Sequence, residues 1–314
     1  MIPVLFDNII FTLQRSGGIS VVWNELLRHA REDADLQCSE LDYVQQLTPR
    51  LLERYRIPAY SPSAPTIFHS SYFRVLPKKG VQNVTTVHDL TYHFYRHGAA
   101  KAVHLWEEER ALRHSEAVIC ISENTKRDLL RFYPWVKEEQ IHVVYNGVGE
   151  EFFPISSVEK KGYLLFIGNS LVPYKRYDVA QEVARLTGLP LVTATNVTRE
   201  ELNRMYNEAL CLLYPSDYEG FGLPILEAQK AGCPVIAQNS SSIPEVIGPD
   251  GLMVAHDTPS RMAEEMADIV RQLQSRSTQD IVAAGIENAK RFSWDTNYEQ
   301  VKKVYENLYY NHNV

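Results

Sequence analysis

Short apolar runs of strand length alternate with amphipathic helical patterns along the whole chain of 314 residues. An order of strand, helix and strand favours a parallel sheet that helices cover on its faces. In the first half of the chain, the predicted strands span residues 3–6, 66–69, 83–87, 117–121 and 141–144. The predicted helices of the same half span residues 19–30, 49–54, 99–113 and 123–132. This alternation predicts an α/β fold.

The alternation restarts after a segment that has no clear periodicity. Asn146 and Gly147 form a turn signal, and residues 147–161 mix Glu, Pro, Ser and Lys, which indicates a connection between domains. Further strands are predicted at residues 162–168, 190–194, 209–213 and 234–237, and helices at 177–187, 199–208, 223–231, 259–274, 278–290 and 294–310. Because a chain of this length can build two cores, we predict domains over residues 1–150 and 151–293, and a C-terminal helix over 294–314.

Composition excludes several classes of function. The net charge of −7 gives no support for a nucleic-acid partner. No apolar run approaches the ~20 residues of a membrane span, and residues 1–7 are too short for a secretory signal and lack a basic flank. The four cysteines have neither metal-type nor redox spacing, so a reducing, cytoplasmic compartment is predicted. His93 and His97 could share a helix face as metal ligands, but no acid at matching spacing supports a metal site.

Residues 214–227, which read YPSDYEGFGLPILE, place two carboxylates eight residues apart, at Glu219 and Glu227. An apolar strand precedes them and a helix starts between them, with Pro224 at a first helical position. The unpaired N–H groups at such a helix start suit a phosphate, and carboxylates accept hydrogen bonds from sugar hydroxyls. For Gly220 and Gly222 alone, a simple tight turn is an equally good interpretation.

The stretch resembles the E-x7-E signature of the retaining GT-B glycosyltransferases of family 4. Residues 231–237 (AGCPVIA) and 242–248 (SIPEVIG) extend the resemblance. It implies two Rossmann-like βαβ domains that face each other across a cleft, the first for the acceptor and the second for the nucleotide-sugar, with the C-terminal helix crossing back to the first. It also implies that Glu219 contacts sugar hydroxyls and Glu227 the ribose. The donor would be bound between them by Gly220, Phe221, Gly222 and Leu223.

A second glycine motif, SGGIS over residues 16–20, lies between the first predicted strand and helix. Gly17 and Gly18 would let backbone N–H groups approach a phosphate at the helix start, although a plain turn explains them equally well. The motif resembles the family's N-terminal glycine loop, which faces the donor diphosphate and the acceptor.

His88 and Asp89 follow a predicted strand in the sequence VHDL. A histidine in this position is commonly a hydrogen-bonded structural residue. The pair resembles the family's His-Asp motif, which implies that His88 hydrogen-bonds the transferred sugar and that Asp89 orients either His88 or the acceptor.

The loop GNSLVPYKR over residues 168–176 places two cations after the first strand of the second half. Cations there suit a departing diphosphate, although a solvated basic turn is the alternative. The loop resembles the family's Gly-Arg…Lys motif, and Lys175 matches its lysine. The arginine position holds Ser170, preceded by Asn169, so either Arg176 supplies the second charge or the diphosphate contact rests on Lys175 and backbone groups.

Together with these residues, the resemblance implies transfer of a hexose from a nucleoside-diphosphate sugar to an acceptor hydroxyl, with retention and with neither metal nor cofactor. Glu219, His88 and Lys175 are the predicted catalytic residues, and Thr195, after the strand at 190–194, is a candidate for contact with the base. The resemblance suggests polysaccharide or lipopolysaccharide assembly, in which a glycan or lipid-linked acceptor would bring the chain to the cytoplasmic face of the inner membrane. A nucleotide-sugar 2-epimerase and a catalytically silent binding protein are the alternatives.

Overall fold

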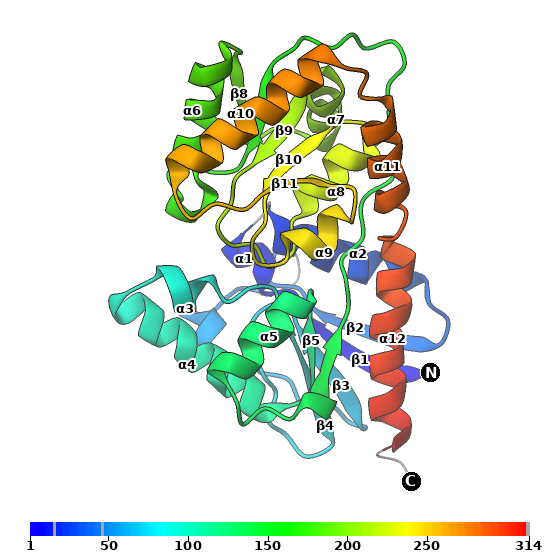
Figure 1. Ribbon diagram of the computed structural model, residues 1–314. Coiled ribbons are helices and arrows are strands. Elements are labelled where there is room, and N and C mark those ends of the chain that lie inside the picture. Colours follow the sequence, from blue (N-terminus) through cyan, green and yellow to red (C-terminus); the bar gives the residue numbers. More distant parts are fainter. Residues whose placement is uncertain (15–16, 45–46, 312–314) are drawn as a thin grey trace. The chain divides into compact units, whose positions relative to one another are not determined.

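The computed structural model describes residues 1–14, 17–44 and 47–311. The chain divides into two compact units (Figure 1). Unit 1 consists of Met1–Gly147 together with the C-terminal segment that starts at Trp294, and unit 2 is Val148–Ser293. Among the described residues, no helix combines the length and the apolar character that crossing a membrane requires.

Unit 1 contains a parallel sheet in the order β2-β1-β3-β4-β5-β6. Its strands are β1 (Ile2–Asp7), β2 (Leu36–Leu41), β3 (Thr66–Ser70), β4 (Val81–Val87), β5 (Ser115–Cys120) and β6 (Ile141–Val143). The chain runs from β1 outward to β2 and then returns to the other side of β1 at β3. This reversal is the topological switch point of the sheet, where loops at the carboxyl ends of the strands diverge and ligands bind in open α/β sheets.

Helices surround this sheet and bury an apolar stripe against it. They are α1 (Ile10–Leu13), α2 (Gly18–Glu32), α3 (Thr91–Tyr95), α4 (Gly98–His114), α5 (Glu123–Phe132) and two 3-10 turns, Glu53–Tyr55 and Glu138–Gln140. The apolar residues of α2 recur every three or four positions, which places them on one face, at Val22, Trp23, Leu26, Leu27 and Ala30. Ser122 caps α5, because its side chain accepts a hydrogen bond from the N–H of Thr125.

The last helix, α12 (Trp294–Asn311), belongs to the core of unit 1 (Figure 1, red). It inserts Tyr298, Val301, Val304 and Tyr305 among the apolar side chains of β1, β3 and α2. The hydroxyl of Tyr305 lies 2.6 Å from Nδ1 of His69 on β3. Helix α12 thus packs into the same core as the N-terminal strand β1.

Unit 2 repeats the same sheet order with a strand fewer. Its parallel sheet runs β11-β10-β9-β7-β8 and contains β7 (Leu164–Ile167), β8 (Leu191–Ala194), β9 (Cys211–Tyr214), β10 (Val235–Gln238) and β11 (Leu252–Val254). The chain passes from β7 to β8 on one side and returns to β9 on the other. The switch point of unit 2 therefore lies between β7 and β9, and the loops after these two strands flank it.

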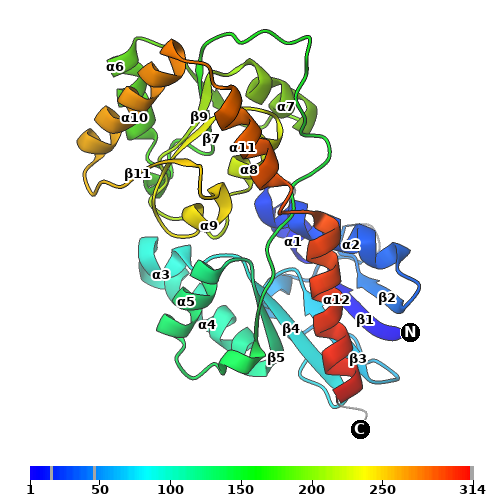
Figure 2. The same ribbon diagram turned by 45° about the vertical axis from the view of Figure 1, so that its right-hand side comes forward.

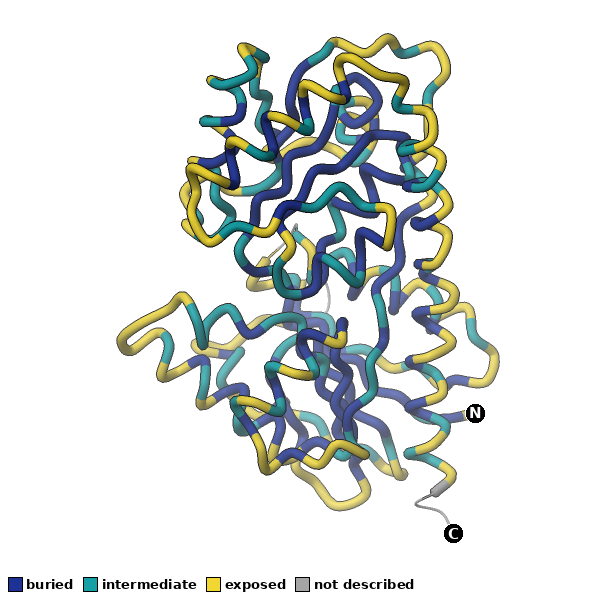
Figure 3. Tube along the Cα trace, in the orientation of Figure 1, coloured by how far each residue is buried: buried dark blue, intermediate teal, exposed yellow. Residues whose placement is uncertain are grey.

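Helices cover both faces of this second sheet (Figure 2). Their bounds are α6 (Tyr177–Thr187), α7 (Arg199–Glu208), α8 (Leu223–Lys230), α9 (Ile243–Ile247), α10 (Pro259–Ser275) and α11 (Gln279–Ala289), with a 3-10 turn at Pro173–Lys175. α6 packs beside α10, and α8 packs beside α11. In Figure 3, the central strands β7, β9 and β10 are mostly buried, whereas the edge strands β8 and β11 are mostly of intermediate exposure.

The segment that follows the unit boundary is fixed to α7 by side-chain amides. Oδ1 of Asn203 accepts a hydrogen bond from the N–H of Phe153 at 3.1 Å. Asn207 accepts one from the N–H of Ile155 at 2.7 Å and donates one to the carbonyl of Phe153 at 3.0 Å. Residues 148–161 contain neither strand nor helix but belong to unit 2 by their contacts.

The α/β fold class with parallel sheets is confirmed, and most element bounds agree with the prediction within two residues. The helix predicted over residues 49–54 is wrong. Leu52 has φ 60° and ψ 33°, which is left-handed backbone, and only the 3-10 turn Glu53–Tyr55 follows it. Strands β2 and β11 and the short helices α1, α3 and α9 were not predicted.

Candidate functional site

The two motif loops of unit 2 meet at its switch point. Lys175 lies on the loop after β7 and Glu219 on the loop after β9, and these strands are neighbours in the sheet. Nζ of Lys175 is 2.6 Å from Oε1 of Glu219, and the two side chains are 21% and 12% exposed. The pair is thus largely shielded but still open to solvent at the carboxyl edge of the sheet, where a ligand can reach it.

Serines from the neighbouring loop hold the Glu219 loop in place. Oγ of Ser241 accepts a hydrogen bond from the N–H of Glu219 at 2.8 Å. The buried hydroxyl of Ser242 lies 2.9 Å from each of the carbonyls of Glu219 and Phe221. Ser242 was predicted only as part of a family motif. The run of three serines at residues 240–242, which Asn239 separates from β10, was the available signal for this role.

The start of α8 has the geometry that its glycine predicts. Gly222 has φ 114° and ψ 49°, a conformation that side chains rarely adopt, and α8 begins at the next residue, Leu223. A Cβ on Gly222 would also lie 3.1 Å from Cδ1 of Ile225. Gly220 and Phe221 are buried within the same loop. Because these glycines carry no side chains, a ligand can approach the backbone at the start of α8 closely and bind the N–H groups there.

The second cation of the β7 loop is held against an acid. Arg176 has left-handed backbone, with φ 54° and ψ 49°, and its Nε lies 3.4 Å from Oδ2 of Asp217. The N–H of Asp217 donates to the carbonyl of Tyr174 at 2.8 Å, which joins the β7 and β9 loops. At the family's arginine position, Ser170 is exposed, while Oδ1 of Asn169 accepts a hydrogen bond from the N–H of Leu171 at 2.9 Å.

Glu227 has a different environment from Glu219. It is 7% exposed and accepts a hydrogen bond from the hydroxyl of Tyr206 at 3.0 Å. Nη2 of Arg199 lies 3.8 Å from its Oε1, and Arg199 also pairs with Glu151. Burial raises the pKa of Glu227 to about 7, although Arg199 and Tyr206 both act to lower it. The two glutamates thus have separate partners and do not share a proton.

Thr195, the candidate for base contact, is exposed directly after β8. β8 pairs with β7, so this residue lies at the same carboxyl edge of the sheet as the Lys175 loop. None of its side-chain contacts distinguishes it from other exposed loop residues.

In unit 1, His88 lines a cavity of about 130 Å³ after β4, together with Tyr72, Thr86, Tyr92 and His104 among others. Burial lowers the pKa of His88 to about 4, so its imidazole is neutral at physiological pH. The rings of Tyr92 and His104 stack with centroids 3.7 Å apart. The neighbouring Asp89 accepts a hydrogen bond from the N–H of Thr91 at 2.9 Å. A neutral imidazole beside aromatic rings can bind a sugar without carrying a charge.

Gly17 and Gly18 lie at the start of α2, where they were predicted. Gly17 has φ 152° and ψ 174°, and a Cβ at this position would collide with the amide of Gln14. α2 begins at Gly18, and the hydroxyl of Ser20 donates to the carbonyl of Gln14 at 2.7 Å. Ser16 of the same motif lies outside the described residues.

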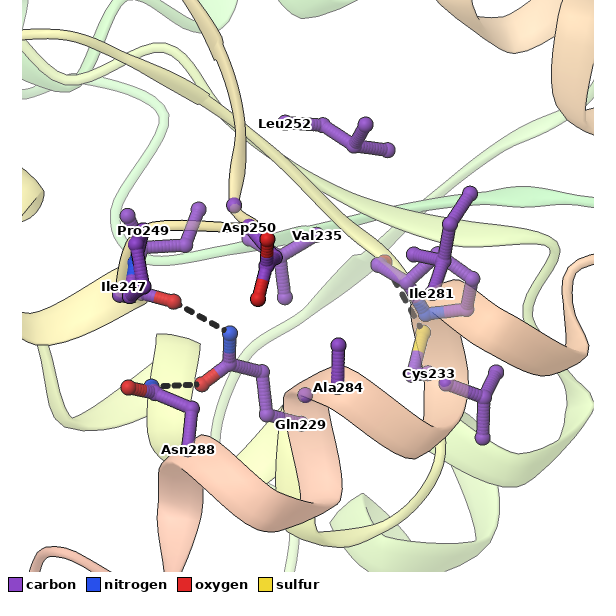
Figure 4. A pocket seen from close by; sticks show the side chains of 15 residues that line it. Gln229, Cys233, Val235, Ile247, Pro249, Asp250, Leu252, Ile281, Ala284 and Asn288 are labelled. Carbon is purple, nitrogen blue, oxygen red and sulfur yellow. Dashed lines mark hydrogen bonds between the residues drawn. The ribbon is translucent and has the colours of Figure 1, made fainter.

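A further cavity at the other end of α8 is not a substrate site. It measures about 30 Å³ and lies among residues of α8, α9 and α11 (Figure 4). Nε2 of Gln229 donates to the carbonyl of Ile247, and Nδ2 of Asn288 donates to Oε1 of Gln229, both at 2.8 Å. Because the space holds about one water and these amides are hydrogen-bonded, the cavity is a packing feature.

Metal ligands do not gather in the described part of the chain, which contains no group of three His, Cys, Asp or Glu residues suited to a metal ion. Nε2 of His93 is instead 2.7 Å from Oε2 of Glu108.

Comparison with known proteins relates both units to glycosyltransferases. Residues 43–152 match the family model described as Glycosyltransferase Family 4, and residues 153–272 match the model described as Glycosyl transferases group 1. The O-antigen chain mannosyltransferase B of Escherichia coli is 42% identical over 113 residues, which are 36% of this chain and 29% of that protein. The MMP alpha-(1->4)-mannosyltransferase of Mycolicibacterium hassiacum is 28% identical over 63% of this chain and 56% of its own. The match thus spans less than a third of the first relative and just over half of the second.

The fold is shared with solved structures over the full chain. Sucrose-phosphate synthase from Thermosynechococcus elongatus aligns with a TM-score of 0.74 at 17% sequence identity, over 99% of this chain and 100% of that one. This likeness identifies the GT-B fold. The two adjoining family matches, one in each unit, show that the chain belongs to the family 4 glycosyltransferases.

Proposed function

We propose that the protein transfers a hexose from a nucleoside-diphosphate sugar to an acceptor hydroxyl, with retention at the anomeric carbon. The observation that carries this proposal is the contact between Lys175 and Glu219 at the switch point of unit 2. A cation and a carboxylate in hydrogen-bond contact match a ligand that carries a diphosphate next to sugar hydroxyls. When the donor binds, its diphosphate replaces Glu219 as the partner of the ammonium group of Lys175, and the sugar hydroxyls replace Lys175 as the partners of the carboxylate of Glu219.

The donor lies along the β9–α8 loop in this proposal. Lys175 and the N–H groups at the start of α8 bind the diphosphate, and Glu219 binds sugar hydroxyls as an acceptor. Glu227 accepts hydrogen bonds from the ribose, a role that its carboxylate form fills more strongly than its protonated form. Ser241 and Ser242 act as positioning residues, because they hold the backbone of Glu219.

The acceptor binds to unit 1 in this proposal. The cavity that His88 lines offers aromatic rings, which suit the apolar face of an acceptor sugar, and the neutral imidazole of His88 hydrogen-bonds the transferred sugar. The match to an O-antigen chain mannosyltransferase supports a glycan or lipid-linked glycan as the acceptor. Polysaccharide or lipopolysaccharide assembly is accordingly the proposed setting.

The chemical step needs no covalent nucleophile from the protein. The acceptor oxygen attacks the anomeric carbon on the face from which the diphosphate leaves, and the bond from this carbon to the phosphate oxygen breaks. The acceptor proton passes to the leaving phosphate. Lys175 and the helix start of α8 stabilise the charge that develops on the diphosphate, so the protein contributes positioning and electrostatic stabilisation.

A donor screen followed by product analysis tests the proposal. Nucleoside diphosphates that stabilise the protein against heat identify the base, and the matching nucleotide-sugars are then incubated with glycan acceptors. The expected product is an α-linked glycoside from an α-linked donor, read by NMR, with no activity in Glu219→Gln. Release of an altered nucleotide-sugar without acceptor would indicate an epimerase. Nucleotide binding without turnover on any acceptor would indicate a silent binding protein.

A further inference from the structure

His104 of α4 lines the same cavity of unit 1 as His88, and its own set of contacts holds it there. It is 8% exposed, and its ring stacks on that of Tyr92, with the two planes 11° apart and the centroids 3.7 Å apart. The ring of Phe73 lies perpendicular to it, at a centroid distance of 5.4 Å. Together these aromatic contacts fix the orientation of the imidazole in the cavity wall.

A chain of hydrogen bonds connects a buried carboxylate to Nδ1 of His104. Glu107, one turn further along α4, is fully buried and accepts two hydrogen bonds from Arg54, at 2.6 and 3.2 Å. Nη2 of Arg54 also donates to the hydroxyl oxygen of Tyr72 at 3.1 Å. That hydroxyl lies 3.1 Å from Nδ1 of His104. The carboxylate thus holds the guanidinium, and the guanidinium orients the hydroxyl that faces the imidazole.

This chain of hydrogen bonds determines which ring nitrogen carries the proton. The oxygen of Tyr72 accepts from Arg54, so its own hydrogen can be donated, and Nδ1 of His104 is the acceptor that the described residues offer it. Burial lowers the pKa of His104 to about 4, and Arg54 acts in the same direction, so the ring is neutral at physiological pH. A neutral imidazole whose Nδ1 accepts carries its hydrogen on Nε2. The described residues offer Nε2 no partner, so this N–H is available to a ligand in the cavity.

The charges around the cavity favour an uncharged ligand. Of the described residues that line it, Asp89 alone carries a formal charge at neutral pH, since burial also keeps His88 neutral. The charge of the nearby Arg54 is compensated by Glu107. A phosphate or carboxylate of the ligand would therefore lose its hydration beside an acid. A hydroxyl or ring oxygen can accept the Nε2–H of His104 without this cost.

We propose that His104 is an acceptor-binding residue that donates Nε2–H to an oxygen of an uncharged acceptor sugar, and that Tyr72 and Arg54 are positioning residues that fix this donor. The inference rests on the proposed function, because that function places the acceptor in this cavity. It adds the chemical class of the sugar bound there, which carries neither phosphate nor carboxylate. It also adds a specificity-determining residue that no sequence motif indicated.

Imidazole NMR of the full chain with isotope-labelled histidine tests the tautomer without any ligand. The signals of His104 are identified by their loss in His104→Gln. We expect the Nε2–H tautomer at neutral pH, with protonation of the ring only as the pH approaches about 4. Tyr72→Phe should populate both tautomers, because Nδ1 loses the hydroxyl that donates to it. An Nδ1–H tautomer in the native chain, or an unchanged His104 signal in Tyr72→Phe, overturns the proposal.

Two substitutions of His104 distinguish the two ring nitrogens in transfer assays. Glutamine places its side-chain N–H near the position of Nε2, whereas asparagine places its N–H near that of Nδ1. The probes are octyl α-hexopyranosides and the same glycosides phosphorylated on the primary hydroxyl, with the nucleotide-sugar that the donor screen selects. His104→Asn should raise the acceptor KM about tenfold, as expected for one lost hydrogen bond, and His104→Gln at most about threefold. His114→Asn, at the exposed end of α4, is the matched control and should behave as the native chain does.

The native chain should use the uncharged glycosides with a kcat/KM at least about tenfold above that for the phosphorylated ones. An unchanged acceptor KM in His104→Asn, equal losses in the asparagine and glutamine variants, or a preference for the phosphorylated glycosides overturns the proposal. So does donor hydrolysis by the native chain without transfer to any uncharged glycoside. Hydrolysis of the donor by water should be the same in all of these proteins, which shows that the variants are folded. Absence of both transfer and hydrolysis in the native chain would instead contradict the proposed function, so the two failures are distinguishable.

Discussion

Nζ of Lys175 lies 2.6 Å from Oε1 of Glu219, so the cation and the first glutamate of the candidate donor site satisfy each other in the structure. A bound donor has to separate them, because its diphosphate and its hydroxyls compete for the two groups. The contact therefore compensates both charges and holds them at the edge of the sheet, and it has to be exchanged for contacts with the donor when the donor binds.

This competition predicts opposite effects from the two neutral substitutions. Lys175→Met should weaken nucleoside-diphosphate binding about 10- to 100-fold, because a charge-assisted contact is lost. Glu219→Gln should leave that affinity unchanged or raise it, because the ammonium group is freed, yet it should abolish sugar transfer. Isothermal titration with nucleoside diphosphates and a transfer assay measure the two effects. Equal losses of nucleotide affinity in both variants would show that the pair acts only as a structural unit.

The arginine beside this pair should be secondary for binding. Arg176 already faces Asp217, and its left-handed backbone suits glycine, so Arg176→Gly should keep the loop folded. We expect at most about a threefold loss of diphosphate affinity, well below that of Lys175→Met. The matched variant is Asp217→Asn, which releases the guanidinium. A gain of affinity in Asp217→Asn together with a large loss in Arg176→Gly would instead make Arg176 the substitute for the family's arginine.

Ser242 should matter for catalysis without touching the donor. Its buried hydroxyl bridges the carbonyls of Glu219 and Phe221, and Ser242→Ala leaves both without this donor. We expect a loss of about 1–3 kcal/mol in unfolding free energy and a fall in kcat larger than the change in KM. Ser240→Ala is the control, because Ser240 is less buried and bonds to the carbonyl of Ser216 instead. Similar kinetics for the two alanine variants would argue against a positioning role for Ser242.

Local signals predicted the elements whose ends are determined locally. The bounds of α7 were predicted without error, and its start is determined locally, because Thr198 and Glu201 form a capping box there. β2, LQCSEL, was missed because it is an edge strand in which exposed polar residues interrupt the apolar pattern. The helix predicted over residues 49–54 does not form because a tertiary contact determines the backbone there, namely the salt bridge between Glu53 and Arg74.

The candidate site was predicted in its parts and not in its arrangement. Motifs identified Lys175 and Glu219 separately, but their contact depends on the order of β7 and β9 in the sheet, which joins residues 44 positions apart. The contact of Ser241 with Glu219 could not be predicted for the same reason, because it depends on β10, which precedes the loop of Ser241, being the neighbour of β9 in the sheet. The partners of Glu227 lie on α7 and could not be assigned from spacing, because helix packing determines them.

The raised pKa of Glu227 predicts a pH dependence of stability. The ordinary value is 4.5 and the folded value is about 7, so the folded state binds an extra proton between these two pH values. The contribution of Glu227 to stability is therefore fully present below pH 4.5 and is lost as the pH rises through about 7. Glu227→Gln lacks this loss. The unfolding free energy of the variant minus that of the native protein should therefore increase with pH across this window, by at most about 1.4 kcal/mol per pH unit.

Urea unfolding of both proteins at a series of pH values measures this difference. The same titration should appear in binding, because the carboxylate accepts hydrogen bonds from ribose hydroxyls more strongly than the protonated acid does. The nucleoside-diphosphate affinity of the native protein, divided by that of Glu227→Gln, should rise as the pH passes through about 7. The ratio cancels the titration of the ligand's own phosphates. Tyr206→Phe removes a hydrogen bond that lowers the pKa of Glu227, so it should move the profile to higher pH. Parallel profiles for the native protein and Glu227→Gln would contradict both the raised pKa and the ribose contact.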